Sequence, residues 1–291
     1  MQRRTVLTLS TRAGTPSITL RRAFQSGRRK STQTVAQAGV PILLRRAPIL
    51  KVELLRVRAA RTEVAVLAYE PRRARGVSLV AGHGYSSSKH NLDFLCAFLA
   101  SHGYGVYSLD FPGHKLGASG GRLAREADLV DAMSAVVEHA MQHGAGQLYT
   151  LGHSMGALTA LRVAAQDERV VGVVSIATGY GRAAAIDSLK GKVTVDFRSS
   201  YVDGLTLPDL MVNADRLLDE ALVGLAGKSA LYVAADHDLM VSLASARELF
   251  ERAPEAKRFV QIQSDHTSAA DHARAPVLEW LNQRHARAEA S

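Results

Sequence analysis

Five consecutive residues, Gly152-His153-Ser154-Met155-Gly156, have the types and spacing needed to present a serine nucleophile. A serine on a sharp turn between a strand and a helix has strained main-chain angles, and flanking glycines let neighbouring backbone approach where a Cβ would clash. Residues 147–151 are typical of a buried strand, and residues 157–165 have the small and apolar side chains of a helix that packs on a sheet. The sequence therefore predicts a turn that holds Ser154 Oγ at the edge of a sheet.

The segments around this motif alternate between strand-like and helix-like from about residue 48 onward. Two strands are predicted first, at 49–57 and 63–69, and we expect them to pair in antiparallel fashion around a turn. Further strands are predicted at 76–81, 105–109, 147–151, 170–176, 230–234 and 259–262, and helices at 91–101, 124–142, 157–165, 242–252 and 270–285. This alternation implies a mostly parallel, three-layer sheet that binds ligands at the carboxyl ends of its strands.

Four short motifs resemble those of the α/β-hydrolases and occur in that family's order. They are GHGYSS at 82–87, LDFPGH at 109–114, the serine motif at 152–156, and the pair ADHDLMV at 235–241 and SDH at 264–266. The resemblance covers residues 48 to 285. It implies an α/β-hydrolase fold, which is a mostly parallel twisted sheet with helices on both faces and a small cap insertion.

The resemblance also implies a catalytic triad in the chain order Ser154, Asp238, His266. A serine hydroxyl is a weak nucleophile at neutral pH, and an imidazole with a pKa near 6.5 is suited to accept its proton during the attack. His266 lies on a polar loop shortly after the strand predicted at 259–262. Asp238 would bond the other ring nitrogen, fix the tautomer and stabilise the imidazolium.

Two main-chain N–H groups are expected to stabilise the negative charge that develops on the substrate oxygen. One belongs to Met155, directly after the nucleophile, and the other to Tyr85, directly after His83-Gly84 of the first motif. The loss of one such donor typically slows the reaction about 100- to 1,000-fold. These two groups form the predicted oxyanion hole.

Two other residues compete for places in the triad. Asp236 flanks the end of the same predicted strand as Asp238, but Asp238 precedes an apolar pair, as the family's acid does, and Asp236 suits a turn. His272 is an alternative to His266, but it falls where the last helix should already be running. Asp238 and His266 are therefore favoured.

Neither a metal ion nor an organic cofactor is expected. His83, His114 and His153 lack the short paired spacing of metal ligands, and in the resemblance His83 and His153 occupy structural positions. Cys96 has apolar neighbours, which favours a place in the core of a helix over a role as nucleophile.

A cap is predicted at residues 178–228, which leaves residues 48–177 and 229–291 as the core. This insertion follows the strand after the serine motif, where the family carries its cap, so we expect it to select the substrate. Within it, helices are predicted at 182–189 and 210–225, an extended segment at 193–198 and a turn at 204–208. Candidate substrate contacts are Tyr85, Tyr180, Phe197 and Tyr201, and packing of the cap onto the core is the alternative for the last three.

Residues 1–47 form a basic leader that is rich in Arg, Ser and Thr and is expected to be disordered. Residues 1–52 hold eleven basic residues and no acidic one, so the rest of the chain has 25 basic and 27 acidic residues. The body therefore lacks the basic surface of a nucleic-acid-binding protein. A mitochondrial-type transit peptide, a basic arm, and extra residues from an upstream start codon all remain open for the leader.

No apolar stretch is long enough for the core of a signal peptide or for a membrane span, so stable insertion into a membrane is not expected. The single cysteine, Cys96, cannot form an internal disulfide, which favours a reducing compartment. We expect a cytoplasmic protein, or a mitochondrial one if the leader is a transit peptide. The oligomeric state is not indicated.

These features predict a serine hydrolase that cleaves a small-molecule carboxylic ester or thioester through an acyl-enzyme intermediate. Serine at the nucleophile position argues against the family members that attack through aspartate or cysteine. Acyl transfer with the same triad is an alternative within the enzymes. A non-catalytic ligand-binding member of the fold is the alternative outside them.

Overall fold

The computed structural model describes residues 6–12, 15–21, 50–187 and 193–285. The chain divides into two compact units, Met1–Arg45 and Arg46–Ser291. In the first unit, β1 (Val6–Arg12) and β2 (Thr15–Arg21) form a two-stranded antiparallel sheet, which the sequence analysis did not predict. Both segments are rich in β-branched residues, which favour extended backbone. The rest of the predicted leader lies outside the described residues.

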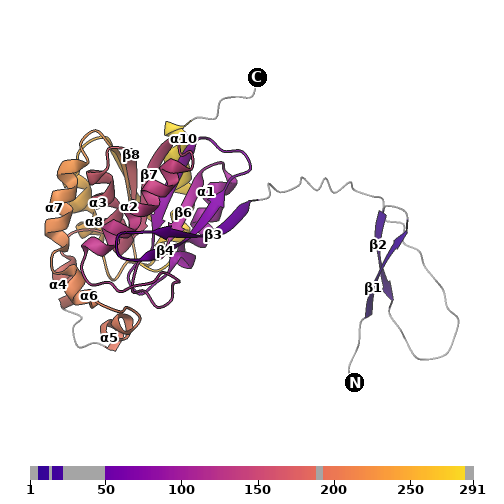
Figure 1. Ribbon diagram of the computed structural model, residues 1–291, viewed down its shortest axis with the longest axis horizontal. Helices are drawn as coiled ribbons and strands as arrows, with labels where there is room; N and C mark the ends of the chain where they lie inside the picture. The colour runs from indigo at the N-terminus through magenta and orange to yellow at the C-terminus, as the bar shows by residue number, and fades with distance from the viewer. Residues whose placement is uncertain (1–5, 13–14, 22–49, 188–192, 286–291) are drawn as a thin grey trace. The chain divides into compact units, whose positions relative to one another are not determined.

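The second unit is built on an eight-stranded sheet with the order β10-β9-β8-β7-β5-β6-β4-β3 (Figure 1). Its strands are β3 (Lys51–Arg58), β4 (Glu63–Glu70), β5 (Val77–Gly82), β6 (Gly105–Leu109), β7 (Gln147–His153), β8 (Val170–Ile176), β9 (Ser229–Ala235) and β10 (Lys257–Ile262). All neighbours from β6 to β10 are parallel, whereas β4 is antiparallel to both β3 and β6. The predicted mostly parallel sheet and its antiparallel opening pair are confirmed.

Helices cover both faces of this sheet, which confirms the three layers (Figure 1). One face packs against α1 (Asp93–Ser101), which follows the short 3-10 helix η1 (Lys89–Leu92), and against α9 (Ala269–His272) and α10 (Arg274–Arg284). The other face packs against α2 (Ala127–Gln142), α3 (Met155–Gln166), α7 (Ala214–Gly224) and α8 (Leu243–Arg252). Among the described residues, no helix is long and apolar enough to cross a membrane.

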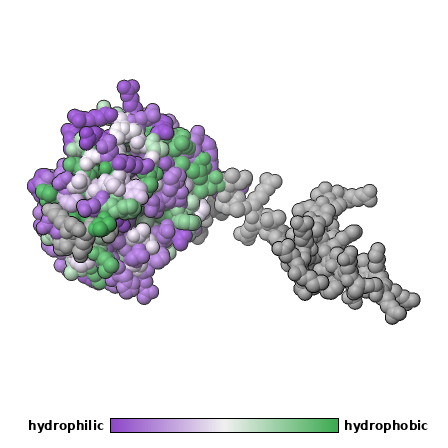
Figure 2. Space-filling model, turned by 90° about the horizontal axis from the view of Figure 1, so that it is seen from below, coloured by the Kyte–Doolittle hydropathy of each residue, from purple (hydrophilic) through white to green (hydrophobic). Residues whose placement is uncertain are grey.

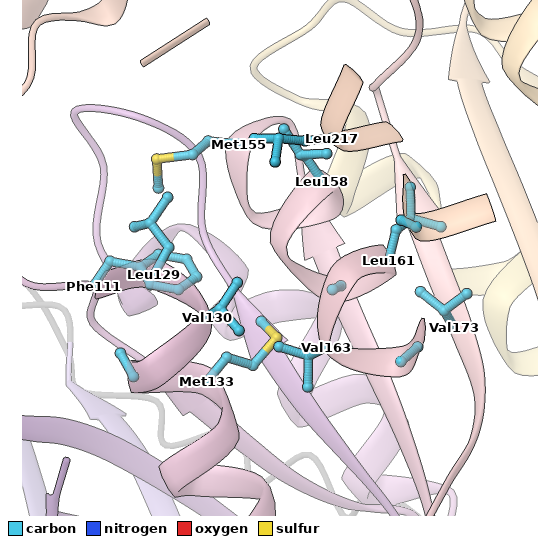
Figure 3. Packing of buried hydrophobic residues seen from close by; sticks show 14 of the residues in the cluster. Phe111, Leu129, Val130, Met133, Met155, Leu158, Leu161, Val163, Val173 and Leu217 are labelled. Atoms are coloured by element: carbon cyan, nitrogen blue, oxygen red, sulfur yellow. The ribbon is translucent and has the colours of Figure 1, made fainter. Parts of the chain in front are cut away.

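The helix α3, which follows Ser154, is buried over most of its length. Figure 3 shows its apolar side chains between those of two neighbouring helices: Val163 lies near Met133 of α2, and Leu158 lies near Leu217 of α7. Close packing on several sides leaves little room for α3 to shift. Ser154 is therefore attached to one of the most constrained elements of the core.

The cap contains three more helices, α4 (Arg182–Asp187), α5 (Val193–Ser200) and α6 (Leu207–Met211), followed by α7. The prediction of an extended segment at 193–198 is wrong, because these residues form α5. Their β-branched side chains favour a strand. The helix instead buries Val195 and places the ring centres of Phe197 and Tyr201 5.1 Å apart. Local propensity is overridden here by packing within the cap.

The boundaries of the other two predicted cap helices also differ. The single helix predicted at 210–225 is divided into α6 and α7 around residues 212–213, where Asn213 donates a hydrogen bond from Nδ2 to Glu126 Oε1 at 3.0 Å. The helix predicted at 182–189 ends as α4 at Asp187, and its last two residues lie outside the described part of the chain.

Main-chain hydrogen bonds join the cap to the loop that follows β6. Asp203 N donates to Gly113 O, Leu123 N donates to Asp203 O, and Leu205 N donates to Leu123 O, each at 2.8 Å. Gly204 has a φ of +130° and lies so close to this loop that a Cβ would approach Leu123 O to 1.9 Å. One edge of the cap is thus fixed to the core by backbone.

An ion pair between Lys89 and Asp110 is buried at the carboxyl ends of β5 and β6. Lys89 Nζ lies 2.6 Å from Asp110 Oδ2, and the two side chains are 4% and 0% exposed. Burial alone would raise the pKa of Asp110, but hydrogen bonds from the Lys89 side chain and from the main-chain N–H groups of Lys89 and Ala118 hold it below its ordinary value. The pair ties the loop after β5 to the loop after β6.

Replacing Lys89 by methionine should lower the free energy of unfolding by about 3–5 kcal/mol, because the carboxylate of Asp110 would be left buried and unpaired. Urea unfolding at pH 7 measures this change. Lys51→Met is the matched control, since Lys51 pairs with Glu53 and Glu70 on an exposed edge and should leave the midpoint almost unchanged. Equal midpoints for the two variants would contradict the expectation.

Candidate active site

Ser154 lies on a strained turn between β7 and α3. Its φ of +56° and ψ of −114° are unusual for a residue with a side chain. A Cβ at Gly152 would lie 2.0 Å from Gly156 O, and a Cβ at Gly156 would lie 2.1 Å from Gly82 O. Both flanking glycines are therefore required by close backbone contacts, as the motif predicted.

The structure brings Ser154, His266 and Asp238 together at the carboxyl edge of the sheet. Ser154 Oγ lies 2.9 Å from His266 Nε2, and His266 Nδ1 lies 2.7 Å from Asp238 Oδ2. The carboxylate accepts the Nδ1 proton, so Nε2 is the nitrogen that can accept the proton of the serine hydroxyl. All three side chains are buried or nearly so.

The carboxylate of Asp238 is held in its ionised form. Burial alone would raise its pKa, but hydrogen bonds from the His266 ring and from the main-chain N–H groups of Val241 and Met240 keep it below the ordinary value. Oδ1 accepts both main-chain bonds, at 2.7 and 2.8 Å, which leaves Oδ2 for the imidazole. The carboxylate is thereby both oriented and charged.

The residues that competed for these places lie elsewhere. Asp236 Oδ1 accepts a hydrogen bond from Ser264 N at 3.0 Å and stabilises a turn. His272 is exposed on α9, with Nδ1 2.8 Å from Gln263 O. Cys96 is buried in α1, where burial raises the pKa of its thiol to about 12 and keeps it protonated.

The loop that follows β5 lies against Ser154. A Cβ at Gly84 would be 3.5 Å from Ser154 Cβ, so the residue before Tyr85 lies against Ser154. Met155 is the first residue of α3, and N–H groups in the first turn of a helix have no partner within the helix. These two N–H groups remain the predicted oxyanion donors.

Histidines hold the loops around the site in place. Phe111 N donates to His83 Nε2 at 3.0 Å, so Nδ1 of His83 carries the proton and donates to Gly84 O at 2.8 Å. On the other side, His153 Nε2 donates to His266 O at 2.7 Å. The ring of His153 is partly accessible, yet desolvation and the neighbouring His266 ring lower its pKa to about 3. Within the described residues, no group of three or more His, Cys, Asp or Glu side chains is arranged to hold a metal ion.

A cavity of about 460 Å³ opens over Ser154 between the core and the cap. Its described lining residues are Gly84, Tyr85, Ser86, Ser87, Asn91, Leu116, His153, Ser154, Arg182, Phe197, Arg198, Tyr201, Leu207, Met240, His266, Thr267 and Ala270. Phe197 and Tyr201 line it from α5 and the turn after α5, and Tyr85 lines it from the core while its hydroxyl donates to Leu205 O at 2.9 Å. Figure 2 shows hydrophobic patches among hydrophilic residues on the face seen from below.

Tyr180 is placed differently from the prediction, because it does not line the cavity. Its hydroxyl donates to Asp219 Oδ1 at 2.5 Å, and the guanidinium of Arg252 lies 4.3 Å from the centre of its ring. Tyr180 therefore packs the cap onto the core, which was the alternative for this residue.

Two arginines of the cavity, Arg182 and Arg198, were not predicted as site residues. Arg182 begins α4 and Arg198 lies on α5. Each stands in a cap sequence without a motif, and only the fold of the cap brings it near Ser154. No local pattern could have identified either one.

Comparisons with known proteins agree with this architecture. The family model described as serine aminopeptidase, S33 (Hydrolase_4), matches residues 73–219, about half of the chain. A comparison with curated protein sequences gives no significant match.

Similar solved structures share the fold at low sequence identity. Esterase Pf2001 from Pyrococcus furiosus has a TM-score of 0.65 at 18% identity, over 80% of this chain and 93% of that one. DcsB, solved in complex with its substrate analogue, has a TM-score of 0.61 at 15% identity, over 83% and 100% of the two chains. Est1E from Butyrivibrio proteoclasticus has a TM-score of 0.57 at 14% identity, over 79% and 96%.

The buried histidines should make the protein sensitive to mild acid. Burial lowers the pKa of His83 to about 3 and that of His114 to about 4, whereas the unfolded chain binds these protons near pH 6.5. The unfolded state therefore binds more protons below pH 6.5, and each histidine should reduce the free energy of unfolding by about 2 kcal/mol at pH 5. Urea unfolding at pH 7.0, 6.0 and 5.0 measures the loss.

His114→Leu should reduce the loss of unfolding free energy between pH 7 and pH 5 by about 2 kcal/mol, the amount expected for one histidine. At pH 7 the substitution removes a ring whose Nε2 is buried without a hydrogen-bond partner among the described residues, and it loses one hydrogen bond, from Nδ1 to Pro112 O at 3.1 Å. His90→Leu, at an exposed histidine, is the matched control. A wild-type stability that does not change between pH 7 and pH 5 would refute the assignment of neutral buried rings.

Proposed function

Because the chain belongs to the α/β-hydrolase family whose model is described as serine aminopeptidase, S33, we propose that it is a serine hydrolase that cleaves a carboxylic ester or thioester through an acyl-enzyme intermediate. The observation that carries the proposal is the continuous hydrogen-bonded chain from Ser154 Oγ to His266 Nε2 at 2.9 Å and from His266 Nδ1 to Asp238 at 2.7 Å. One of the similar solved structures, Pf2001 from Pyrococcus furiosus, is an esterase by name.

In the first half of the reaction, Ser154 Oγ attacks the carbonyl carbon while His266 Nε2 takes the hydroxyl proton. The carbonyl electrons move to the oxygen, and the N–H groups of Tyr85 and Met155 stabilise that negative charge. His266 then gives its proton to the leaving alcohol or thiol, and the acyl group remains on Ser154.

In the second half, water attacks the acyl group and His266 again serves first as base and then as acid. Asp238 supports both halves in the same way, because an ionised carboxylate beside Nδ1 stabilises the imidazolium that forms twice in each cycle. The products are a carboxylic acid and the regenerated serine.

The lining of the cavity favours an ester or thioester over the N-terminal residue of a peptide. Recognition of a free α-amino group requires an anionic or strongly accepting partner. Among the described residues that line the cavity there is no Asp or Glu, and the charged side chains are Arg182 and Arg198. This balance of charge is unfavourable for an ammonium group.

A fluorophosphonate should label the wild-type protein at Ser154, detected as a single adduct by intact-mass spectrometry. Ser154→Ala should give no adduct and should lower kcat/KM for a short-chain ester by more than about 1,000-fold, because the attacking oxygen is gone. His266→Ala should label very slowly, because no base takes the serine proton.

His272→Ala is the matched control for the histidine, since its ring is exposed on α9 and should leave labelling at the wild-type rate. A folded wild-type protein that neither labels nor hydrolyses any ester would overturn the proposal and favour a ligand-binding member of the fold.

A further inference from the structure

A buried arginine lies beside the proposed nucleophile. Arg182 is 3% exposed, lines the cavity, and places Nη2 3.5 Å from Ser154 Oγ, which is long for a hydrogen bond. Its Nε is buried and has no hydrogen-bond partner among the residues that the structure describes. Nε and Nη2 form one edge of the guanidinium, and that edge can bind a carboxylate through two parallel hydrogen bonds.

No carboxylate of the described residues forms an ion pair with Arg182. Asp238 and Asp215 act on it only from a distance, since Asp238 is bonded to His266 and Asp215 accepts the main-chain N–H of Gly181. Burial lowers the pKa of Arg182 to about 10, so the side chain is still positively charged at neutral pH. A buried charge of this kind is costly unless a partner compensates it.

The rest of the cavity has the same sign of charge. Arg198 also lines it, and among the described lining residues there is no Asp or Glu. With a volume of about 460 Å³, the cavity suits a small ligand. Both its charge and its size therefore select for a compact anion.

We propose that the substrate carries a carboxylate within a few bonds of its scissile carbonyl, and that Arg182 binds this carboxylate through Nε and Nη2. This inference rests on the proposed function, because it names the class of ester that the same site accepts. It assigns to Arg182 the role of a specificity-determining residue. A single guanidinium edge matches one carboxylate better than a doubly charged phosphate, which would require further donors.

The position of Arg182 makes the carboxylate important for turnover as well as for binding. When Ser154 is attacking, His266 becomes an imidazolium, and a second positive charge beside Oγ opposes its formation. A substrate carboxylate neutralises Arg182 and removes this repulsion. Neutral esters would leave the guanidinium unpaired next to the reacting atoms, so they should react slowly.

The test compares anionic esters with neutral isosteres, in which a carboxamide replaces the carboxylate. Monoethyl succinate and ethyl succinamate carry the group on the acyl side, and 2-acetoxyacetate and 2-acetoxyacetamide carry it on the alcohol side. Product release is followed by NMR. For at least one pair, wild-type kcat/KM should be about 100-fold higher for the anion, and the pair that discriminates identifies the side of the ester that Arg182 contacts.

Arg182→Gln should reduce this anion-to-neutral ratio about 100-fold, and Arg182→Lys should reduce it less, because lysine keeps the charge but not the paired donors. Arg216→Gln is the matched control. It removes a positive charge from the same cap at an exposed ion pair with Glu220, and it should leave the ratio at the wild-type value. The ratio measured on the wild-type protein still tests the proposal if the Arg182 variants fail to fold.

If the wild-type protein hydrolyses esters but has the same kcat/KM for the anionic and the neutral ester in each pair, the carboxylate inference is overturned. The proposed function is left intact by that result. The carboxylate inference is also overturned if Arg182→Gln lowers kcat/KM equally for anionic and neutral esters, because the effect of Arg182 would then not depend on the charge of the substrate. Failure of fluorophosphonate labelling together with failure of all four esters overturns the proposed function, and the inference with it.

Discussion

The close backbone contact at the turn between β7 and α3 is the constraint on which the site depends. Ser154 keeps its positive φ because β7 and α3 approach each other closely at Gly152, while α3 approaches the end of β5 at Gly156. Neither approach leaves room for a side chain on the glycine. The helix that follows is packed on several sides (Figure 3). Strain at one residue is thereby balanced by the packing of a whole layer.

The partners of Ser154 reach it through the parallel arrangement of the sheet. Asp238 follows β9 and His266 follows β10, so the carboxyl ends of three strands deliver three side chains to one edge. A second set of contacts fixes the loops around the site: His83 and the Lys89–Asp110 pair join the loops after β5 and β6, and His153 bonds the loop after β10. The side chains of the site are therefore held in place by contacts within the protein, an arrangement that favours electrostatic stabilisation of a transition state.

The sequence was sufficient where a local pattern determines the structure. The strands at 105–109 and 170–176 and the turn at Ser154 follow from short apolar runs and from glycine spacing, which act over a few residues. The sequence was insufficient where contacts between residues far apart in the chain determine the structure. Helix α5 forms in spite of β-branched residues, and Arg182 enters the site only through the folded cap. The sheet formed by β1 and β2 was also missed, because its apolar pattern is weak.

The attachment of the cap to the core and the lining of the cavity depend largely on different residues. Backbone hydrogen bonds along residues 203–205 and the packing of α7 on α3 help to hold the cap in place, and neither set of contacts involves a side chain of α4 or α5. Residues on α4 and α5 can therefore change while Ser154 and the loops around it stay as they are. Evolution can alter which acid derivatives are accepted at little cost to the chemistry, so closely related chains with the same reactive centre are free to diverge in their metabolic roles.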